Sequence, residues 1–102
     1  MCSSDLETIY VSLTPGTTEA QVAAIMQAAY ADAPFVRLTG TTLPEIKHVA
    51  HTNFCDIGWK IDEPTGRAVF VVVIDNLVKG AAGQGVQNLN LLLGLDERTG
   101  LL

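Results

Sequence analysis

The spacing of apolar positions changes several times along the chain, and each change predicts a different element. Residues 7–13 alternate between apolar and polar, which predicts a half-buried strand whose apolar face holds Ile9, Val11 and Leu13. Apolar residues then recur at intervals of three and four, which predicts a helix from Thr18 to about Ala31. Thr18 followed by Gln21 is typical of a capping box at a helix start. The apolar stripe of this helix would consist of Val22, Ile25, Met26 and Ala29.

The middle of the chain predicts short strands. Residues 35–38 read as one short strand, and residues 46–52 as another with a weaker pattern. Residues 56–62 alternate clearly and place Ile57, Trp59 and Ile61 on one face. After a turn at residues 63–66, the continuous apolar run 68–74 predicts a buried strand that returns as a hairpin.

The segment after this buried strand has an unusual composition. It predicts a helix over residues 78–93, closed by Gly94, yet it carries Gly80, Gly83 and Gly85 in its interior. Each glycine costs a helix roughly 1 kcal/mol relative to alanine. We therefore expect the backbone here to approach another element or a ligand closely.

Together these elements predict an α+β fold: a mixed, mostly antiparallel sheet with two main helices, both on one face. A chain of 102 residues forms one small domain at most. No internal repeat or linker divides it.

Charge and composition exclude several function classes. The net charge is −5, and the six lysines and arginines are scattered, so no phosphate-binding footprint for nucleic acid is present. No apolar run reaches the roughly 18 residues of a membrane span, and the N-terminus has no signal-peptide pattern. Cys2 and Cys55 make no disulfide framework, so we expect a reducing cytoplasm.

Cys55 has His48, His51 and Asp56 nearby in sequence, which raises two chemical interpretations. A cysteine–histidine nucleophile is disfavoured, because two histidines three apart on a strand point to opposite faces. A zinc site is disfavoured because two tight ligand pairs are not present. A structural cysteine is the favoured interpretation. We therefore expect no catalytic residue and no metal ligand.

The glycines of the last helix match no known phosphate-binding motif. Their order is G-x-x-G-x-G, which differs from the dinucleotide fingerprint, and they lie inside the helix. Taken alone, they are better explained as a small-residue helix face packed tightly against a neighbouring element. The opposite face of the helix is mostly amide, which predicts contact with another polar surface; it carries Lys79, Gln84, Gln87, Asn88 and Asn90.

Asn76 stands where a buried strand ends and a helix begins. Ligand contacts of α/β folds concentrate at such positions. Asparagine is equally a favoured helix N-cap. Position alone leaves both roles open.

The string IDNLVKGAAGQ, followed by VQNLNLLLGLDE, resembles the C-terminal region of the N-acetyl-gamma-glutamyl-phosphate reductase family. NFCDIGW at residues 53–59 and ETIYVSL at residues 7–13 fit the same family in the same order. The resemblance covers residues 6–102 and leaves residues 1–5 unmatched. It implies part of a glyceraldehyde-3-phosphate-dehydrogenase-like C-terminal domain, used for catalysis and dimerisation. One departure is Gly85, where the family more often has alanine.

The resemblance also implies a function. The family reduces an acyl phosphate to an aldehyde with NADPH, through a cysteine nucleophile and a histidine acid/base. It implies cofactor contacts by Asn76, facing the nicotinamide carboxamide, and by Lys79 and Gly80 beside it. The Rossmann cofactor domain, the nucleophile motif and the histidine segment have no counterpart in this sequence. We therefore expect a C-terminal fragment that is inactive alone.

The implied partners are the missing Rossmann domain, which binds most of the NADPH, a second copy in a homo-oligomer, and a small acyl phosphate. Two alternatives remain open. One is a related acyl-phosphate reductase, similar to aspartate semialdehyde dehydrogenase or to a carrier-protein-linked homologue. The other is a non-catalytic dimerisation module.

Overall fold

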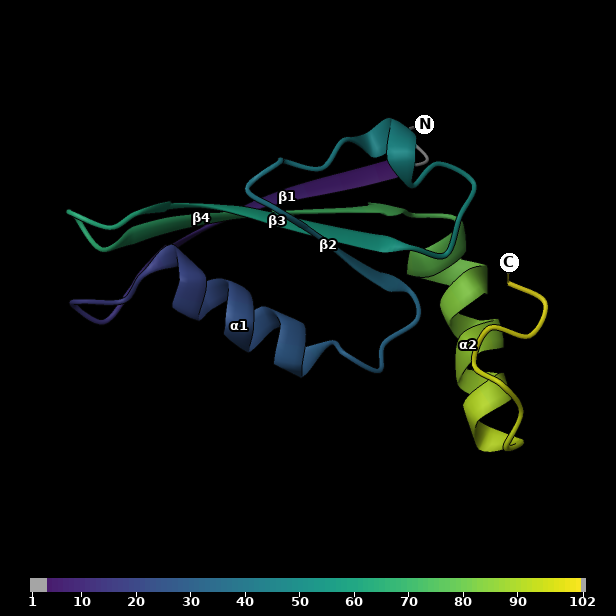
Figure 1. The fold of residues 1–102 in the computed structure, drawn as a ribbon. Coiled ribbons are helices and arrows are strands. Elements are labelled where there is room, and N and C mark those ends of the chain that lie inside the picture. Colours follow the sequence, from purple (N-terminus) through teal and green to yellow (C-terminus); the bar gives the residue numbers. More distant parts are fainter. Residues whose placement is uncertain (1–3, 102) are drawn as a thin grey trace.

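The computed structural model describes residues 4–101. Their four strands form one sheet in the order β1-β4-β3-β2 (Figure 1). Its strands are β1 (Ser4–Ser12), β2 (Val36–Gly40), β3 (Cys55–Asp62) and β4 (Arg67–Asp75). β4 pairs antiparallel with β1 and β3, whereas β2 pairs parallel with β3. The predicted α+β class with a mixed, mostly antiparallel sheet is confirmed. Cys2 lies outside the described residues.

Helix α1 (Glu19–Ala29) covers one face of the sheet, with the capping box between Thr18 and Gln21 that the sequence predicts. Val22 packs from this helix onto Ile57 and Trp59 of β3, and these three buried side chains form the core of that face. The indole Nε1 of Trp59 donates to Glu19 Oε1 at 3.1 Å, so the start of the helix is fixed to the sheet.

The opposite face is covered by a loop that contains the short 3-10 helix η1 (Ile46–His48). The predicted strand over residues 46–52 is therefore wrong. The amides of His48 and Val49 donate to carbonyls three residues back, and His51 has a left-handed φ of 64°. Both features turn the chain back on itself. The loop buries Val49 against Val71 and Val73 of β4, which explains the weak apolar pattern that resembled a strand.

Strand β1 is more exposed than its alternating pattern predicts. The predicted apolar face exists, because Ile9 pairs with Phe70 and Val11 with Ala68, but both side chains are exposed. Helix α1 packs over β2, β3 and β4 and does not reach across β1. On the same side Ile25 of the predicted helix stripe is 66% exposed, so only part of that stripe is buried.

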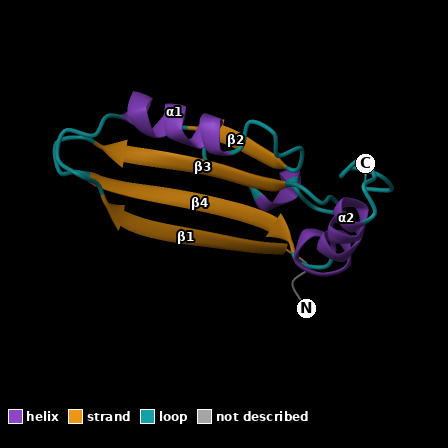
Figure 2. Cartoon of the chain, turned by 90° about the horizontal axis from the view of Figure 1, so that it is seen from below, coloured by secondary structure: helices purple, strands orange, loops and turns teal. Residues whose placement is uncertain are grey.

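The last helix leaves the end of the sheet instead of covering a face, unlike the predicted arrangement (Figures 1 and 2). It begins with a π-helical turn, η2 (Val78–Ala82), and continues as α2 (Gly83–Leu92). Gly94, at φ 70°, ends it: the amides of Gly94 and Leu95 donate to the carbonyls of Leu91 and Asn90. This is a Schellman motif, as a helix-terminating glycine predicts.

Candidate functional site

The junction between β4 and the last helix is organised by a buried carboxylate. Asp75 Oδ2 accepts the backbone N–H of His51 at 2.7 Å, and Asp75 Oδ1 accepts that of Leu77 at 2.9 Å. The hydrogen bond from His51 is the largest cause that lowers the pKa of Asp75, while burial acts in the opposite direction. Asp75 therefore closes an Asx turn just before the helical segment, whose N-cap residue, Leu77, has no side-chain cap. Neither Asp75 nor Asn76 is the N-cap residue, so the predicted helix N-cap role of Asn76 is wrong.

Asn76 does not cap the helical segment, and its side chain lies exposed just before that segment begins. Its Oδ1 lies close to Gly80, where an added Cβ would approach it to 3.3 Å. The structure thus brings together Asn76 and Gly80, two of the three predicted cofactor contacts. A side-chain amide offers both a donor and an acceptor, which is the hydrogen-bonding pattern of a carboxamide ligand.

The π-helical turn beside Asn76 accounts for one of the glycines. The amide of Ala82 donates to the carbonyl of Leu77 at 3.3 Å, and the amide of Gly83 donates to that of Val78, each five residues back. A Cβ on Gly83 would collide with the Val78 carbonyl and with the Asn53 side chain. The predicted close approach of the backbone is confirmed here. Single π-helical turns often occur at functional sites.

Lys79 points away from Asn76 into a polar network between α2 and the sheet. Its Nζ donates to Gln87 Oε1 at 2.7 Å and lies 5.8 Å from the centroid of the Phe35 ring. Asn53 Nδ2 donates to the same oxygen at 2.8 Å. Gln87 Nε2 in turn donates to Glu97 Oε2 at 2.5 Å. The ammonium group is therefore held by Gln87, some distance along the helix from the exposed amide of Asn76.

The chain's own residues satisfy part of the amide face of the last helix. Asn90 is buried and donates to the carbonyls of Glu97 and Thr99 at 3.0 and 2.9 Å. Gln87 is half-buried in the network above. Gln84 and Asn88 remain exposed and bond to each other at 2.9 Å. The predicted polar partner surface is thus partly supplied by the C-terminal residues.

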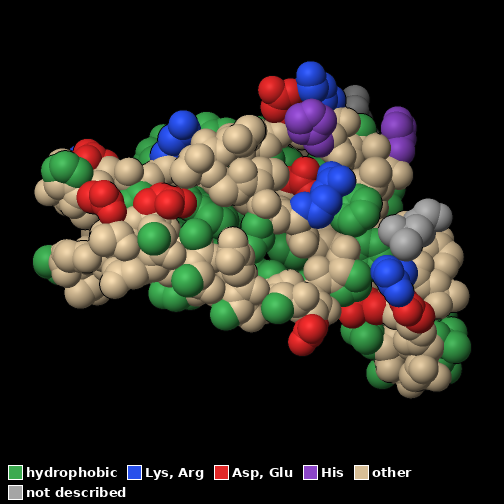
Figure 3. All heavy atoms as spheres, viewed as in Figure 1, with side chains coloured by type: hydrophobic (Ala, Val, Ile, Leu, Met, Phe, Trp, Pro, Cys, Tyr) green, Lys and Arg blue, Asp and Glu red, His purple; other side chains and the backbone are tan. Residues whose placement is uncertain are grey.

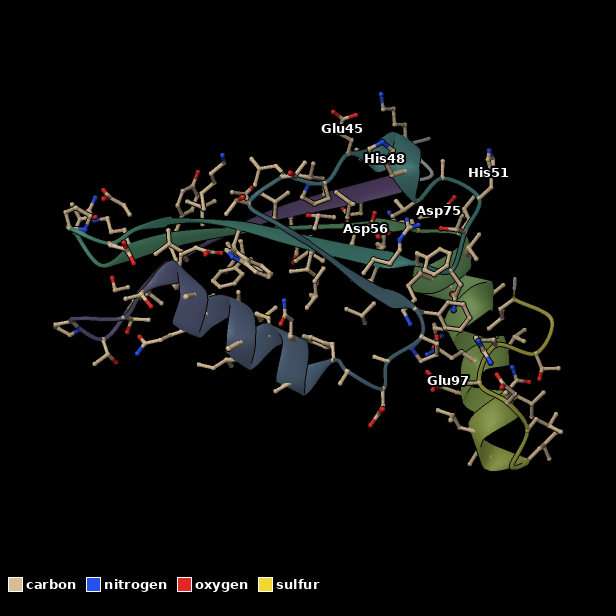
Figure 4. All side chains as sticks on the ribbon, viewed as in Figure 1. Glu45, His48, His51, Asp56, Asp75 and Glu97 are labelled. Carbon is tan, nitrogen blue, oxygen red and sulfur yellow. The ribbon has the colours of Figure 1, made fainter. Side chains whose placement is uncertain are left out.

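Cys55 has the surroundings of a structural cysteine. Its side chain is half-buried at the start of β3, and burial raises the pKa of its thiol, which the charge of Lys79 only partly offsets. A protonated thiol is a poor nucleophile. His48 and His51 both lie on the loop above the sheet (Figure 4). Among residues 4–101, no group of three histidine, cysteine or acidic side chains is placed to hold a metal ion.

The surface offers no broad basic patch on the face shown in Figure 3, where the lysines and arginines are few and separated. Within the described part of the chain, no helix has the length and apolar character needed to cross a membrane.

The sequence is similar to a known family and to proteins of known name. Residues 4–76 match the family described as semialdehyde dehydrogenase, dimerisation domain. The chain is 50% identical over 97 residues to the N-acetyl-gamma-glutamyl-phosphate reductase of Desulforapulum autotrophicum and 43% identical over 96 residues to that of Syntrophobacter fumaroxidans. Each match covers 94% of this chain and 28% of the relative. A third, from Pelodictyon phaeoclathratiforme, is 47% identical and covers 99% of this chain and 31% of the relative.

The resemblance to these reductases, predicted from the strings IDNLVKGAAGQ and NFCDIGW, is confirmed, and the chain spans about 28% of the relatives' length. The family match takes in all four strands of the sheet and ends at Asn76. The chain therefore belongs to the semialdehyde dehydrogenase dimerisation-domain family.

Proposed function

We propose that this chain is the C-terminal part of an NADPH-dependent reductase that converts N-acetyl-gamma-glutamyl phosphate to N-acetylglutamate semialdehyde and phosphate. The observation that carries the proposal is identity of 43–50% over about 95% of the chain to relatives that bear the name of this enzyme. This substrate is favoured over those of related acyl-phosphate reductases for the same reason. A cytoplasmic location belongs to the same proposal.

Within that enzyme, Asn76 would bind the cofactor. NADPH would supply the hydride, and this chain would contribute by orienting the nicotinamide ring. The exposed amide of Asn76 fits the carboxamide of that ring, because it offers both a donor and an acceptor. Gly80 leaves room beside it, since any side chain there would crowd Asn76 Oδ1. Lys79 would affect the cofactor only indirectly, because its ammonium group donates to Gln87 further along the helix.

The cofactor domain and a second copy of the chain are the proposed protein partners. Helix α2 projects beyond the sheet with a row of exposed leucines, and Leu92 is 83% exposed. Contiguous exposed apolar side chains of this kind mark protein contacts. We assign α2 to contact with the cofactor domain and the sheet to contact with a second copy, because the dimerisation-domain match covers the sheet and ends before α2.

A chimera tests the catalytic proposal. The C-terminal region of the Desulforapulum autotrophicum reductase that matches this chain would be replaced by residues 6–102. We expect NADPH oxidation that depends on N-acetyl-gamma-glutamyl phosphate. A folded chimera that binds NADPH and shows no such turnover would contradict the proposed function.

Asn76→Ala in that chimera tests the cofactor contact. We expect a rise in the KM for NADPH of about tenfold, the loss of roughly one hydrogen-bonded contact. Gln27→Ala is the matched control, because Gln27 is also an exposed side-chain amide and lies on α1, away from the helix assigned to the cofactor domain. Equal effects of the two substitutions would remove Asn76 from the cofactor site.

A further inference from the structure

A buried carboxamide lies between the sheet and the last helix, outside the proposed cofactor contacts. Asn53 stands two residues before β3 and is 1% exposed. The segment that carries it is fixed to the sheet, because the Cys55 amide donates to the Phe35 carbonyl at 2.7 Å. Asn53 Nδ2 donates to Gln87, whereas its Oδ1 accepts no hydrogen bond from the described residues. A buried oxygen of this kind calls for an explanation.

Two charged groups decide which way this carboxamide points. Lys79 and Glu97 bind opposite ends of the Gln87 amide: the Lys79 ammonium donates to Oε1 at 2.7 Å, and Nε2 donates to the Glu97 carboxylate. Reversing the Gln87 amide would set its NH₂ group against an ammonium and its oxygen against a carboxylate. Gln87 therefore offers an acceptor to Asn53, so Asn53 presents Nδ2 to it and turns Oδ1 the other way.

The Oδ1 atom of Asn53 is turned toward Gly83. A Cβ added at Gly83 would overlap this oxygen, so the hydrogen that glycine carries in place of Cβ points at it. A Cα–H contact of this kind is a weak hydrogen bond, and here it is available only to glycine. The Gly83 amide donates to the Val78 carbonyl and closes the π-helical turn. Asn53 thus holds the end of that turn from the side of the sheet.

The same turn contains the glycine that lies against Asn76. Gly80 is part of it, and a Cβ there would approach Asn76 Oδ1 to 3.3 Å and Ile74 Cδ1 to 3.4 Å. An α-helical turn closes four residues back and a π-helical turn five, so a change from one to the other rotates Gly80 relative to the end of β4. The surroundings of the Asn76 amide therefore depend on whether the turn stays π-helical.

We propose that Asn53 is a positioning residue for the cofactor site. Its carboxamide, held between Gln87 and Gly83, keeps the turn π-helical and so keeps Asn76 in the orientation that meets the nicotinamide carboxamide. Asn53 acts through the turn and not by contact with the cofactor, because its own side chain is buried. The inference deepens the cofactor contact of the proposed function and rests on it.

Amide hydrogen exchange measures the turn itself, on the chimera without NADPH and with mass spectrometry as the readout. In Asn53→Ala, the peptide that contains Ala82 and Gly83 should exchange about five- to tenfold faster, because the turn loses its support from the sheet. Trp59→Phe is the matched control: it removes another buried side-chain hydrogen bond, to Glu19 of α1, and should leave this peptide unchanged. Unchanged exchange in Asn53→Ala would overturn the proposal.

The affinity for NADPH, measured by fluorescence titration without acyl phosphate, shows whether Asn53 acts through Asn76. Asn53→Ala should raise the Kd about three- to tenfold in the chimera that keeps Asn76, and should not change it in the Asn76→Ala chimera, where no amide is left to orient. Gln87→Met should act in the same direction, since it removes the acceptor that holds Asn53 and leaves Gly83 in place. This second variant decides the question if Asn53→Ala does not fold.

A rise in Kd that requires Asn76 supports the proposal. An equal rise in both backgrounds would show that Asn53 supports the fold in general, and an unchanged Kd would show that the site does not depend on it; either result overturns the positioning role. If Asn76→Ala itself leaves the Kd unchanged, the cofactor contact and the positioning role fall together. A chimera that binds NADPH without turnover contradicts the reductase proposal alone, since neither measurement uses the acyl phosphate.

Discussion

The carboxylate of Asp75 accepts the backbone amide of His51 at 2.7 Å, although the two residues are far apart in the sequence. This hydrogen bond joins the end of β4 to the loop over the sheet, at the point where His51 adopts a left-handed backbone conformation. The same carboxylate accepts the backbone amide of Leu77 in an Asx turn just before the helical segment. One buried side chain therefore fixes the strand end, the loop and the first helical turn on which Asn76 is presented.

Asp75→Ala should lower the melting temperature of the chain clearly, because it leaves the amides of His51 and Leu77 without their acceptor. Asp75→Asn keeps the shape and one acceptor oxygen, so we expect a smaller loss. Thermal unfolding followed by circular dichroism measures both. Equal melting temperatures for wild type and Asp75→Ala would show that this carboxylate does not hold the junction.

His51→Gly provides the opposite test of the same junction. The φ of 64° is costly for histidine and allowed for glycine, and the backbone N–H to Asp75 is retained. We expect unchanged or slightly raised stability. His51→Val, which is β-branched and tolerates this conformation poorly, should destabilise the chain. If glycine and valine had the same effect, backbone conformation at this position would not matter.

The pH dependence of stability should reflect Asp75. Its pKa is lowered in the folded chain, so the ionised form is favoured by folding. This contribution is complete above the pKa of an unfolded aspartate, about 3.9, and is lost as the pH falls through the lower folded value. Asp96, whose pKa is lowered to about 2 by Arg98, acts in the same direction. Urea unfolding between pH 2 and 5 should show a shallower acid loss for Asp75→Asn than for wild type.

The regular elements were predictable because their signals are local. The capping box at Thr18 and the alternation of Ile57, Trp59 and Ile61 each depend on residues a few positions apart, and the structure confirms both. The loop over residues 46–52 was not predictable in this way. Its apolar residue Val49 is buried by a distant strand, and its turn is fixed by an acceptor at Asp75.

The candidate site was predictable only in part, for a related reason. Strand-to-helix position identified Asn76, but its exposure depended on which of two adjacent polar side chains turns inward. Asp75 does so because β4 alternates, and its odd-numbered residues Val71 and Val73 face the loop side. The exposure of β1 was likewise missed, because alternation shows which face is apolar and does not show whether anything covers it.

Arg37 and Asp56 form an ion pair whose loss should be costly. Arg37 Nε and Nη2 donate to the buried carboxylate at 2.6 and 3.0 Å, and Nη2 also donates to the His48 carbonyl at 2.9 Å. Arg37→Leu would leave Asp56 uncompensated. We expect a loss of about 2–3 kcal/mol of unfolding free energy, below the 3–5 of a fully buried pair, since Arg37 is 42% exposed.

Urea unfolding of the double variant Arg37→Leu with Asp56→Leu separates this cause from lost packing. If the uncompensated carboxylate is what destabilises the single variant, the double variant should recover part of the loss. The single variant Asp56→Leu completes the comparison. A double variant whose loss of unfolding free energy equals the sum of the losses in Arg37→Leu and Asp56→Leu would show that the two side chains act independently.

Two glycines of the last helix should respond in opposite directions to the same substitution. Gly85→Ala meets no atom within 4 Å and should stabilise the chain by roughly 0.5–1 kcal/mol, the difference in helix propensity. Gly83→Ala gains the same propensity and places its Cβ against the Val78 carbonyl and the Asn53 side chain, so we expect net destabilisation. Because the Val78 carbonyl belongs to the backbone, the collision is relieved only if the π-helical turn opens.

Thermal unfolding shows whether each variant raises or lowers the melting temperature. If Gly83→Ala stabilised the chain as Gly85→Ala does, the tight turn beside Asn76 would not need a glycine, and the glycines of this helix would have to be explained by a contact with the cofactor or its domain.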